Sequence, residues 1–336
     1  MQYKLMDSRE INRDKWKSFV LTHPNGTVFH TDYMFDLYSL TPKHDPFILF
    51  AINNSGSIEA IIPGYIQKVI PWPFSLVSSR CIVMQSPLYV NPIALDFLLN
   101  GLRRYVGNRV IYTEIRSNIL GEQREVYESN KFFFEDHLNI INDLTSPLDD
   151  LWKMVVSRAR TKVRKAERNG LVPCLGDVTH LREAYSVLQH TYKREKLPLI
   201  DYSFFEEGLI TSNVDSGMEV FIVILEGVII HTQIIMRYKK KLYAYYGGIL
   251  DKYKNTGAND LLTWFIIKWG HDHGFTELDF GGAGKPNVPY GVRDYKLKFG
   301  GKLDNFGRFK YVNSPLKYTI ASKGFELLRK LKRRWF

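Results

Sequence analysis

One pattern of predicted elements occurs twice along this chain of 336 residues, and that repeat constrains the fold more than any other feature. Two apolar stretches joined by a short polar turn predict a β-hairpin at residues 47–66, and a second hairpin of the same kind is predicted at residues 220–236. After each hairpin, a further strand leads into a helical segment and then into another strand, over residues 81–115 and 242–280. The repeat predicts two domains of similar architecture.

The fold class that follows is α+β, a mixed α/β arrangement in which each domain is a mixed twisted sheet flanked by helices. A chain of this length is also expected to form two domains of roughly 150 residues each. A turn at residues 145–147 precedes an acidic helix start, and we place the domain boundary there. The first domain is then residues 1–145, completed by the C-terminal segment 312–336, and the second is residues 146–311.

The charge balance favours polyanionic partners. The 46 Lys and Arg residues exceed the 35 Asp and Glu residues, which gives a formal net charge of +11. Nucleic acid, a phosphorylated substrate or an anionic membrane face would each suit such a chain. Cys81 and Cys174 lie far apart and outside any metal-binding spacing, so we expect reduced thiols and neither a disulfide nor a metal site. The first residues lack the apolar core of a signal peptide, so we expect a cytoplasmic protein.

A long amphipathic helix is predicted directly after the domain boundary. Apolar residues recur along it at helical spacing and should face the core, namely Leu151, Val155, Ala159, Val163 and Ala166. The opposite face is cationic and carries Lys153, Arg160, Arg164 and Arg168. This face is either an ordinary solvated surface or a surface that binds phosphate.

Two other basic segments carry weaker signals. His271 and His273 fall in the last turn of a predicted helix, where cations complement the helix dipole, so we expect them to be structural. Residues 323–336 combine Phe, Leu and Trp with five Arg and Lys residues near their end, a composition typical of a basic amphipathic helix on an anionic membrane. A plain closing helix with a solvated tail fits this segment equally well.

Glycines and lysines are concentrated between residues 278 and 301. A short strand ends there in three glycines, where the backbone must turn sharply or approach a ligand closely. Residues 295–299 then alternate aromatic or apolar side chains with lysines, which predicts a strand that presents Lys296 and Lys298 on one face. We therefore expect this segment to meet a ligand.

Several motifs of the second half together resemble one family. They are R-x-x-V-R-K-A-E-R-N-G at residues 160–170, YYGG at residues 245–248, and DFGG at residues 279–282 followed by GV-x-x-Y-K-x-x-F-G-G. In these motifs the chain resembles the Fem-type transferases, which belong to the GNAT acyltransferase superfamily and carry two tandem GNAT-like domains. The resemblance implies transfer of an aminoacyl group from aminoacyl-tRNA to an amine of a cell-wall precursor, whereas other GNAT members use acyl-CoA.

The resemblance also implies a set of site residues. The family's F-K-x-x-F signature falls on residues 295–299, so Lys296 is the candidate catalytic residue, whose ammonium would stabilise charge on the transferred acyl group. The alternative is a surface lysine on a strand. Arg194 lies where the family carries an arginine for phosphates, and the alternative is an exposed arginine beside Glu195 at a helix end. The other candidate substrate-binding residues are Arg160, Arg164, Tyr246, Gly281, Gly282 and Lys298.

Two departures from related patterns bear on the substrates. Tyr38 stands at the position of a lysine in the family's Q-S-x-x-W-x-x-x-K motif, which counts against a nucleotide-linked muropeptide acceptor. GNAT enzymes that bind CoA usually carry Q/R-x-x-G-x-G/A at a helix start, where backbone amides hold pyrophosphate. Residues 253–259 match that pattern imperfectly, which weakens the case for CoA.

The sequence thus predicts an N-acyltransferase of Fem type, with aminoacyl-tRNA as preferred donor and an amine of a cell-envelope or surface-polysaccharide precursor as acceptor. No tightly bound cofactor is expected. One alternative is a GNAT enzyme that uses acyl-CoA or another acyl thioester on an amino sugar. A further alternative is a nucleic-acid or membrane adaptor without catalysis on the same scaffold. We expect a cytoplasmic location, with peripheral contact at the inner membrane face.

Overall fold

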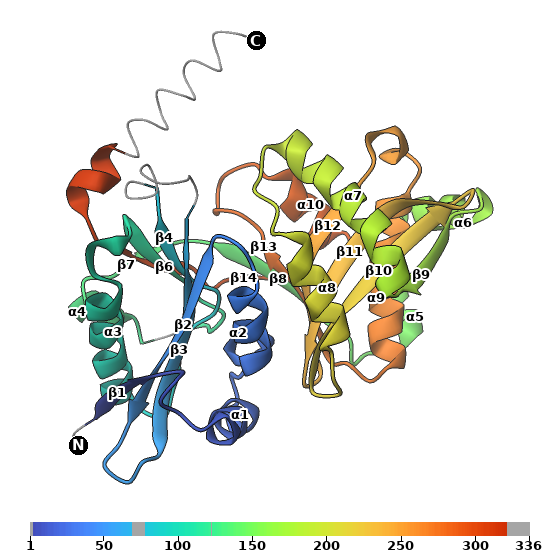
Figure 1. The fold of residues 1–336 in the computed structure, drawn as a ribbon. Coiled ribbons are helices and arrows are strands. Elements are labelled where there is room, and N and C mark those ends of the chain that lie inside the picture. The colour runs from blue at the N-terminus through green and yellow to red at the C-terminus, as the bar shows by residue number, and fades with distance from the viewer. Residues whose placement is uncertain (1–2, 69–77, 122, 321–336) are drawn as a thin grey trace. The chain divides into compact units, whose positions relative to one another are not determined.

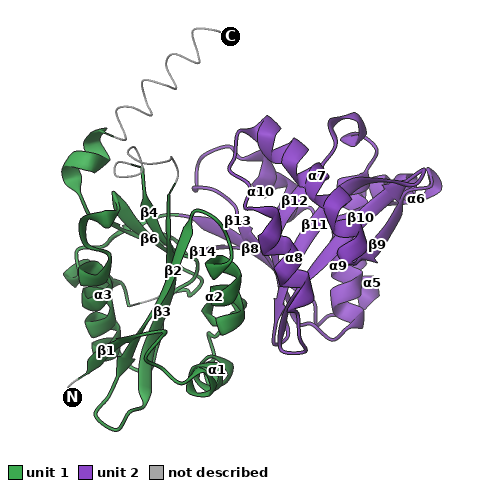
Figure 2. Ribbon diagram, in the orientation of Figure 1, with its two compact units in different colours: residues 1–136, 306–336 green, residues 137–305 purple. Residues whose placement is uncertain are grey.

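The computed structural model describes residues 3–68, 78–121 and 123–320, and the chain forms two compact units. Unit 1 comprises residues 1–136 and 306–336, and unit 2 comprises residues 137–305 (Figure 2). The strand β8 (Leu138–Asp143) pairs with strands of unit 2, although the predicted boundary at residue 145 assigned it to the first domain. The turn at residues 145–147 therefore follows the first strand of unit 2 and does not separate the units.

Unit 1 is built on a mixed sheet whose strands follow the order β1-β2-β3-β4-β6-β15-β7, with β5 beside β3. β15 comes from the C-terminal part of the chain and lies between β6 and β7. The elements of unit 1 are β1 (Lys4–Asp7), α1 (Arg13–Thr22), α2 (Asp32–Ser39), β2 (His44–Ile52), β3 (Ile58–Gln67), β4 (Arg80–Val83), β5 (Leu88–Tyr89), α3 (Pro92–Val106), β6 (Tyr112–Arg116), α4 (Arg124–Ser129), β7 (Phe133–Glu135) and β15 (Arg308–Val312).

Unit 2 is built on a second mixed sheet, with strand order β14-β8-β13-β12-β11-β10-β9. After β8, its elements are α5 (Leu148–Met154), α6 (Ser157–Arg168), β9 (Val172–Gly176), α7 (Val178–Glu195), α8 (Tyr202–Ile210), β10 (Ser216–Leu225), β11 (Val228–Tyr238), β12 (Lys241–Ile249), α9 (Ala258–Asp272), β13 (Glu277–Gly282), α10 (Gly291–Leu297) and β14 (Lys302–Asn305).

The two units repeat one topology, as the sequence predicted. The hairpin β2–β3 corresponds to the hairpin β10–β11, and each is followed by an antiparallel strand, β4 or β12. A helix, α3 or α9, then connects that strand to a parallel partner, β6 or β13. Both hairpins and the predicted α+β class are confirmed.

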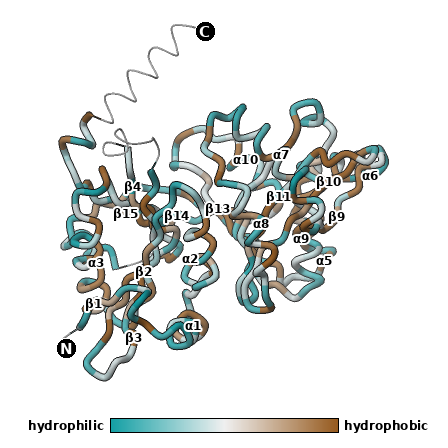
Figure 3. Tube along the Cα trace, viewed as in Figure 1, coloured by the Kyte–Doolittle hydropathy of each residue, from teal (hydrophilic) through white to brown (hydrophobic). Residues whose placement is uncertain are grey.

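Helices cover both faces of each sheet (Figure 1). In unit 1, α3 packs on one face of β2 and β3, and α2 packs on the other. In unit 2, α7 and α8 cover one face, while α9 and α6 cover the opposite one. Hydrophobic residues occur along the central strands and along the helices that cover them (Figure 3), as expected of strands that are buried on both faces.

The predicted long helix after residue 147 is in fact two helices. Val155 and Val156 have extended backbone conformations, so the chain breaks between α5 and α6. The β-branched Val pair disfavours a continuous helix only weakly, and tertiary packing decides the break. The predicted core-facing residues are nevertheless all buried, from Leu151 to Ala166.

Residues 295–299 do not form the predicted strand, because most of them belong to the helix α10. Tyr295 and Phe299 are four residues apart, so both can lie on one face of a helical turn, and Phe299 is buried in the core of unit 2. Lys296 and Lys298 are only two residues apart, so a helical backbone directs them to different sides. The prediction that both ammonium groups share one strand face is therefore wrong.

Candidate active site

The candidate site begins where two parallel strands of unit 2 separate. β12 and β13 pair over only three residues of each strand, ending at Tyr243 and Asp279. Beyond this point β12 continues to Ile249 along β11, with a bulge in the pairing at Ile234 and Ile235. The last residues of β12 therefore have no strand partner on the β13 side, and this separation leaves room for a ligand.

A cavity of about 370 Å³ lies along this separated part of β12. Strands β11, β12 and β13 and helices α7, α9 and α10 all contribute side chains to it. The lining includes Thr191, Tyr192, His231, Gln233, Tyr245, Tyr246, Asn259, Thr263, Phe280, Tyr295 and Lys296. Of the predicted site residues, Lys296 and Tyr246 are thus brought together at one cavity.

Two glycines of β12 allow helix α7 to approach the strand closely. A Cβ atom on Gly248 would lie 3.0 Å from the carbonyl oxygen of Val187 and 3.2 Å from the Cα of Leu188, which are backbone atoms of α7. A Cβ on Gly247 would meet the amide of Gln233 at 3.0 Å. The YYGG motif therefore sets the distance between α7 and the floor of the cavity.

Side chains of α7 occupy part of the open edge of β12. The hydroxyl of Thr191 accepts a hydrogen bond from the backbone nitrogen of Ile249 at 2.9 Å and donates to its carbonyl oxygen at 3.0 Å. An extended ligand cannot add to the sheet at Ile249 without displacing the side chain of Thr191.

Lys296 is the cationic group of the cavity. Its Nζ donates a hydrogen bond of 2.8 Å to the carbonyl oxygen of Gly282, at the end of β13. Burial lowers the pKa of Lys296 to about 8, and the nearby carboxylate of Asp279 opposes that shift. Burial likewise raises the pKa of Asp279 to about 6. At neutral pH the site therefore holds an ammonium that is close to its point of deprotonation.

The neighbours of Lys296 are fixed by hydrogen bonds. The buried hydroxyl of Tyr295 lies 2.7 Å from the hydroxyl of Thr263 and 2.9 Å from the carbonyl oxygen of Asn259, so it joins α10 to the start of α9. An ammonium held by such a framework can stabilise negative charge that develops on a carbonyl oxygen during acyl transfer. This chemistry requires neither a covalent nucleophile nor a metal.

Sequence reasoning missed two polar residues on β11, His231 and Gln233. They are two residues apart in a buried strand, so they lie on the same face and both line the cavity. His231 is 5% exposed, and its Nδ1 has no hydrogen-bond partner among the described residues. Burial lowers the pKa of His231 to about 3, so its ring is uncharged. The polar residues within the otherwise apolar stretch VIIHTQIIM were the signal that could have found them.

The three predicted arginines already have protein partners and do not line the cavity. Arg194, near the end of α7, donates hydrogen bonds of 2.8 Å to both Asp251 and Glu195. Arg160 donates to the backbone carbonyl oxygens of residues 152 and 153. The guanidinium of Arg164 lies 5.6 Å from the ring centre of Trp152. Phosphate binding by these residues stays a prediction.

Gly281, Gly282 and Lys298 surround the cavity without lining it directly. Gly281 has a φ of +71°, a conformation that favours glycine, and its backbone nitrogen donates to Asp279. Gly282 supplies the carbonyl oxygen that binds Lys296. The Nζ of Lys298 lies 5.1 Å from the ring centre of Tyr295, which is the geometry of a cation–π contact.

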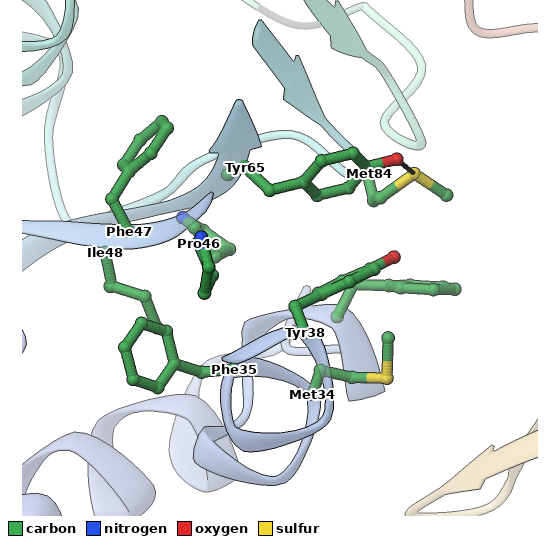
Figure 4. A pocket seen from close by; sticks show the side chains of 11 residues that line it. Met34, Phe35, Tyr38, Pro46, Phe47, Ile48, Tyr65 and Met84 are labelled. Atoms are coloured by element: carbon green, nitrogen blue, oxygen red, sulfur yellow. Dashed lines mark hydrogen bonds between the residues drawn. The ribbon is translucent and has the colours of Figure 1, made fainter. Parts of the chain in front are cut away.

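A smaller hollow lies in unit 1, around Tyr38 (Figure 4). The rings of Tyr38 and Tyr65 are 4.5 Å apart, and the hydroxyl of Tyr65 donates to the sulfur of Met84 at 3.6 Å. Its volume of about 20 Å³ is roughly that of one water molecule. Aromatic packing therefore replaces the cationic group that the family's motif places at this position.

Other predicted features carry no site among the described residues. His271 and His273 bind the backbone carbonyl oxygens of Leu144 and Trp269, which agrees with a structural role. The described part of the chain contains no group of three or more His, Cys, Asp or Glu residues that could hold a metal ion. None of the described helices is long and apolar enough to span a membrane. The basic segment 323–336 lies outside the described residues.

Comparison with known proteins agrees with this geometry. A model of the acetyltransferase (GNAT) domain matches residues 155–297, which include the cavity. The lipid II:glycine glycyltransferase of Staphylococcus aureus is 21% identical in an alignment that covers 98% of this chain and 100% of that protein. The crystal structure of FemX has a TM-score of 0.71 at 18% identity and covers 95% of this chain and 100% of FemX. A tandem GNAT protein from the clavulanic acid biosynthesis pathway has a TM-score of 0.58 at 9% identity, with 94% and 99% covered.

The repeated topology, the separated strands and the GNAT match define this protein as an acyltransferase of the GNAT superfamily. Its similarity to the glycyltransferase and to FemX extends over both units. Within the superfamily, the chain is similar in sequence and fold to these Fem-type proteins along nearly its whole length.

Proposed function

We propose that this protein transfers an aminoacyl group from aminoacyl-tRNA to an amine of a cell-envelope precursor. The observation that carries the proposal is the partly buried ammonium of Lys296, held at the end of β13 in the cavity of unit 2. The glycyltransferase relative, whose name specifies lipid II as its substrate, supports a lipid-linked cell-wall precursor as the acceptor.

The reaction requires the protein to position the two substrates and to place a positive charge beside the reacting carbonyl group. The neutral acceptor amine attacks the ester carbonyl of the donor, so that a C–N bond forms and the ester C–O bond breaks. The ribose oxygen leaves with a proton, and the amine nitrogen loses one. The ammonium of Lys296 would stabilise the oxyanion of the tetrahedral intermediate, which is worth on the order of 10²–10³ in rate for one donor of this kind.

The start of α9 supports aminoacyl-tRNA over acyl-CoA as donor. Pyrophosphate binding requires free backbone amides at a helix N-terminus. Gly257 and Ala258 are buried here, and a Cβ on Gly257 would lie 2.8 Å from the carbonyl oxygen of Lys162 in α6. Asp260, in the first turn, is 4% exposed, and its carboxyl group lies 3.9 Å from the ammonium of Lys162 in α6. Helix α6 and this carboxyl group therefore take the space that pyrophosphate would need.

Tyr38 supports a lipid-linked acceptor over a soluble nucleotide-linked one. The described neighbours of Tyr38 in its hollow are aromatic, apolar or sulfur-containing side chains, so the hollow offers no ammonium for a nucleotide diphosphate. The net charge of +11 would still attract tRNA and an anionic membrane surface.

Mass spectrometry of the products would test donor and acceptor together. The full-length protein would be incubated with glycyl-tRNA, alanyl-tRNA, seryl-tRNA or acetyl-CoA, each with lipid II or with the soluble nucleotide-linked precursor. We expect a mass increase of one aminoacyl residue on lipid II, only with charged tRNA. Acetyl transfer from acetyl-CoA, or thermal stabilisation by it, would instead support a thioester donor. RNA binding that depends on salt, without any transfer, would indicate an adaptor.

We also propose contact with anionic membrane through residues 323–336. The segment places Phe325, Leu328 and Trp335 among several Arg and Lys residues, a pattern typical of interfacial helices. Co-sedimentation with phosphatidylglycerol vesicles would compare the full chain with a chain that ends at residue 322. Equal binding by both proteins would contradict the proposal.

A further inference from the structure

The carboxylate of Asp279 holds the turn at which β13 ends. Its Oδ1 accepts a hydrogen bond of 2.6 Å from the backbone nitrogen of Gly281, and the side-chain amide of Asn139 approaches the same oxygen at 3.4 Å. The positive φ of Gly281 redirects the chain immediately afterwards. Because Asp279 is only 7% exposed, water can compete little for these contacts.

The same turn supplies the hydrogen-bond partner of Lys296. Its Nζ binds the carbonyl oxygen of Gly282, the residue that follows Gly281. The ring of His137 packs beside this glycine, since a Cβ on Gly282 would lie 2.8 Å from it. The position of the ammonium therefore depends on the turn, and the turn is held by Asp279.

Of the charged and titratable groups around Asp279, Lys296 is its ionic partner at the site. Glu277, on the same strand, and Lys241 of β12 both act on the charge of Asp279, but they form an ion pair of 3.0 Å with each other. The Tyr243 hydroxyl, also from β12, is kept protonated because burial and nearby carboxylates raise its pKa. On β8 the neighbour is the uncharged Asn139, and α10 contributes Lys296. Lys296 is thus the cation of α10 that faces this carboxyl group.

We infer that Asp279 is the positioning residue of the site: its buried carboxylate fixes the turn that binds Lys296, and its negative charge keeps that lysine protonated. The catalytic part of the inference rests on the proposed function. The structural part does not, because protonation of Lys296 can be measured without any substrate. Deprotonation of Asp279 would then favour the ammonium, and loss of its charge would favour the free amine.

The test is the pH dependence of chemical labelling at Lys296. The full-length protein would be treated with trace acetic anhydride between pH 5 and pH 10, and modification of the Lys296 peptide would be read by mass spectrometry. Asp279→Asn keeps an oxygen for the Gly281 nitrogen but removes the charge. We expect its labelling midpoint to fall by about one pH unit from about 8, which raises the free-amine fraction at pH 7 about fivefold. Glu277→Gln, the matched control, is expected to keep the wild-type midpoint.

Identical labelling curves for the wild type and a folded Asp279→Asn variant would overturn the inference. If that variant does not fold, Lys296→Met provides the reciprocal test, because loss of the ammonium must raise the titration midpoint of the Asp279 carboxyl group in carbon-13 NMR spectra. An unchanged Asp279 midpoint would also overturn the inference. A shifted labelling curve in a protein that transfers no aminoacyl group would contradict the proposed function and leave the role of Asp279 intact.

Discussion

At the scale of single residues, the ammonium of Lys296 is expected to dominate catalysis. Lys296→Met keeps the length of the side chain but removes its charge, so we predict a loss of turnover of tens-fold or more, as is typical of a lost oxyanion donor. Lys302→Met is the matched control, because Lys302 is exposed on β14. Single-turnover assays with charged tRNA would measure both variants. Wild-type turnover in Lys296→Met would rule out this role.

The buried ring of His231 should make the fold sensitive to acid. The pKa of His231 is lowered to about 3, so the folded protein keeps the neutral ring while the unfolded chain binds a proton below about pH 6.5. The stability due to the neutral ring is complete above pH 6.5 and is lost as the pH falls towards 3, by up to about 1.4 kcal/mol per pH unit. His231→Leu should therefore make the free energy of unfolding less dependent on pH below about pH 6.5.

Urea unfolding between pH 4 and pH 7 would measure this slope. The control is His273→Leu, because His273 is exposed at the C-terminal end of α9. We expect that variant to keep the wild-type slope. An unchanged slope in His231→Leu would show that other groups account for the acid sensitivity.

At the scale of elements, the packing of α7 on β12 depends on Gly248. A Cβ there would press on backbone atoms of α7, which cannot rotate away as a side chain can. We predict that Gly248→Ala costs about 1–3 kcal/mol, the usual range for an overpacked site. Gly291→Ala is the matched control, since a Cβ on Gly291 has open space around it. Urea denaturation would compare the two, and equal stability would contradict this account of the YYGG motif.

Elements whose sequence signal is local were predicted well. The turn at Glu226-Gly227 lies between two apolar stretches, and the hairpin formed as expected. The alternation of apolar residues with lysines at residues 295–299 predicted a strand, which is wrong, because the burial of Phe299 in the core of unit 2 selects a helix. The break at Val155 carries no Pro or Gly signal and depends on the packing of α5 and α6.

The residues of the candidate site show the same difference between local sequence signals and long-range packing. Lys296 was found through a motif, and Tyr246 through its place in YYGG, because both lie in short stretches of distinctive sequence. His231 and Asp279 were not recognised as site residues, because their importance depends on β11, β12 and β13 meeting in one sheet. Contacts between distant segments decide which buried polar residues face a cavity, so the local pattern VIIHTQIIM marks His231 as unusual but does not place it at a site.

At the scale of the whole molecule, the two units differ in which segments of the chain supply the strands of their sheets. All seven described strands of the unit 2 sheet lie within residues 137–305, whereas the unit 1 sheet receives β15 from beyond that segment. β15 lies between β6 and β7, and the buried ring of Phe309 stacks on Tyr127 at 3.8 Å. Unit 1 should therefore fold only when the segment that carries β15 is present, whereas unit 2 should fold from residues 137–305 alone.

Three truncated proteins would test this difference by calorimetry. We predict that residues 137–305 alone unfold cooperatively, because the fragment contains its own sheet and core. A chain of residues 1–305 should lose the unfolding transition of unit 1, since removal of β15 leaves β6 and β7 without their shared partner and opens a cavity at Phe309. Residues 1–320 keep β15 and are the matched control. If residues 1–305 retained both transitions, the sheet of unit 1 would not depend on its C-terminal strand.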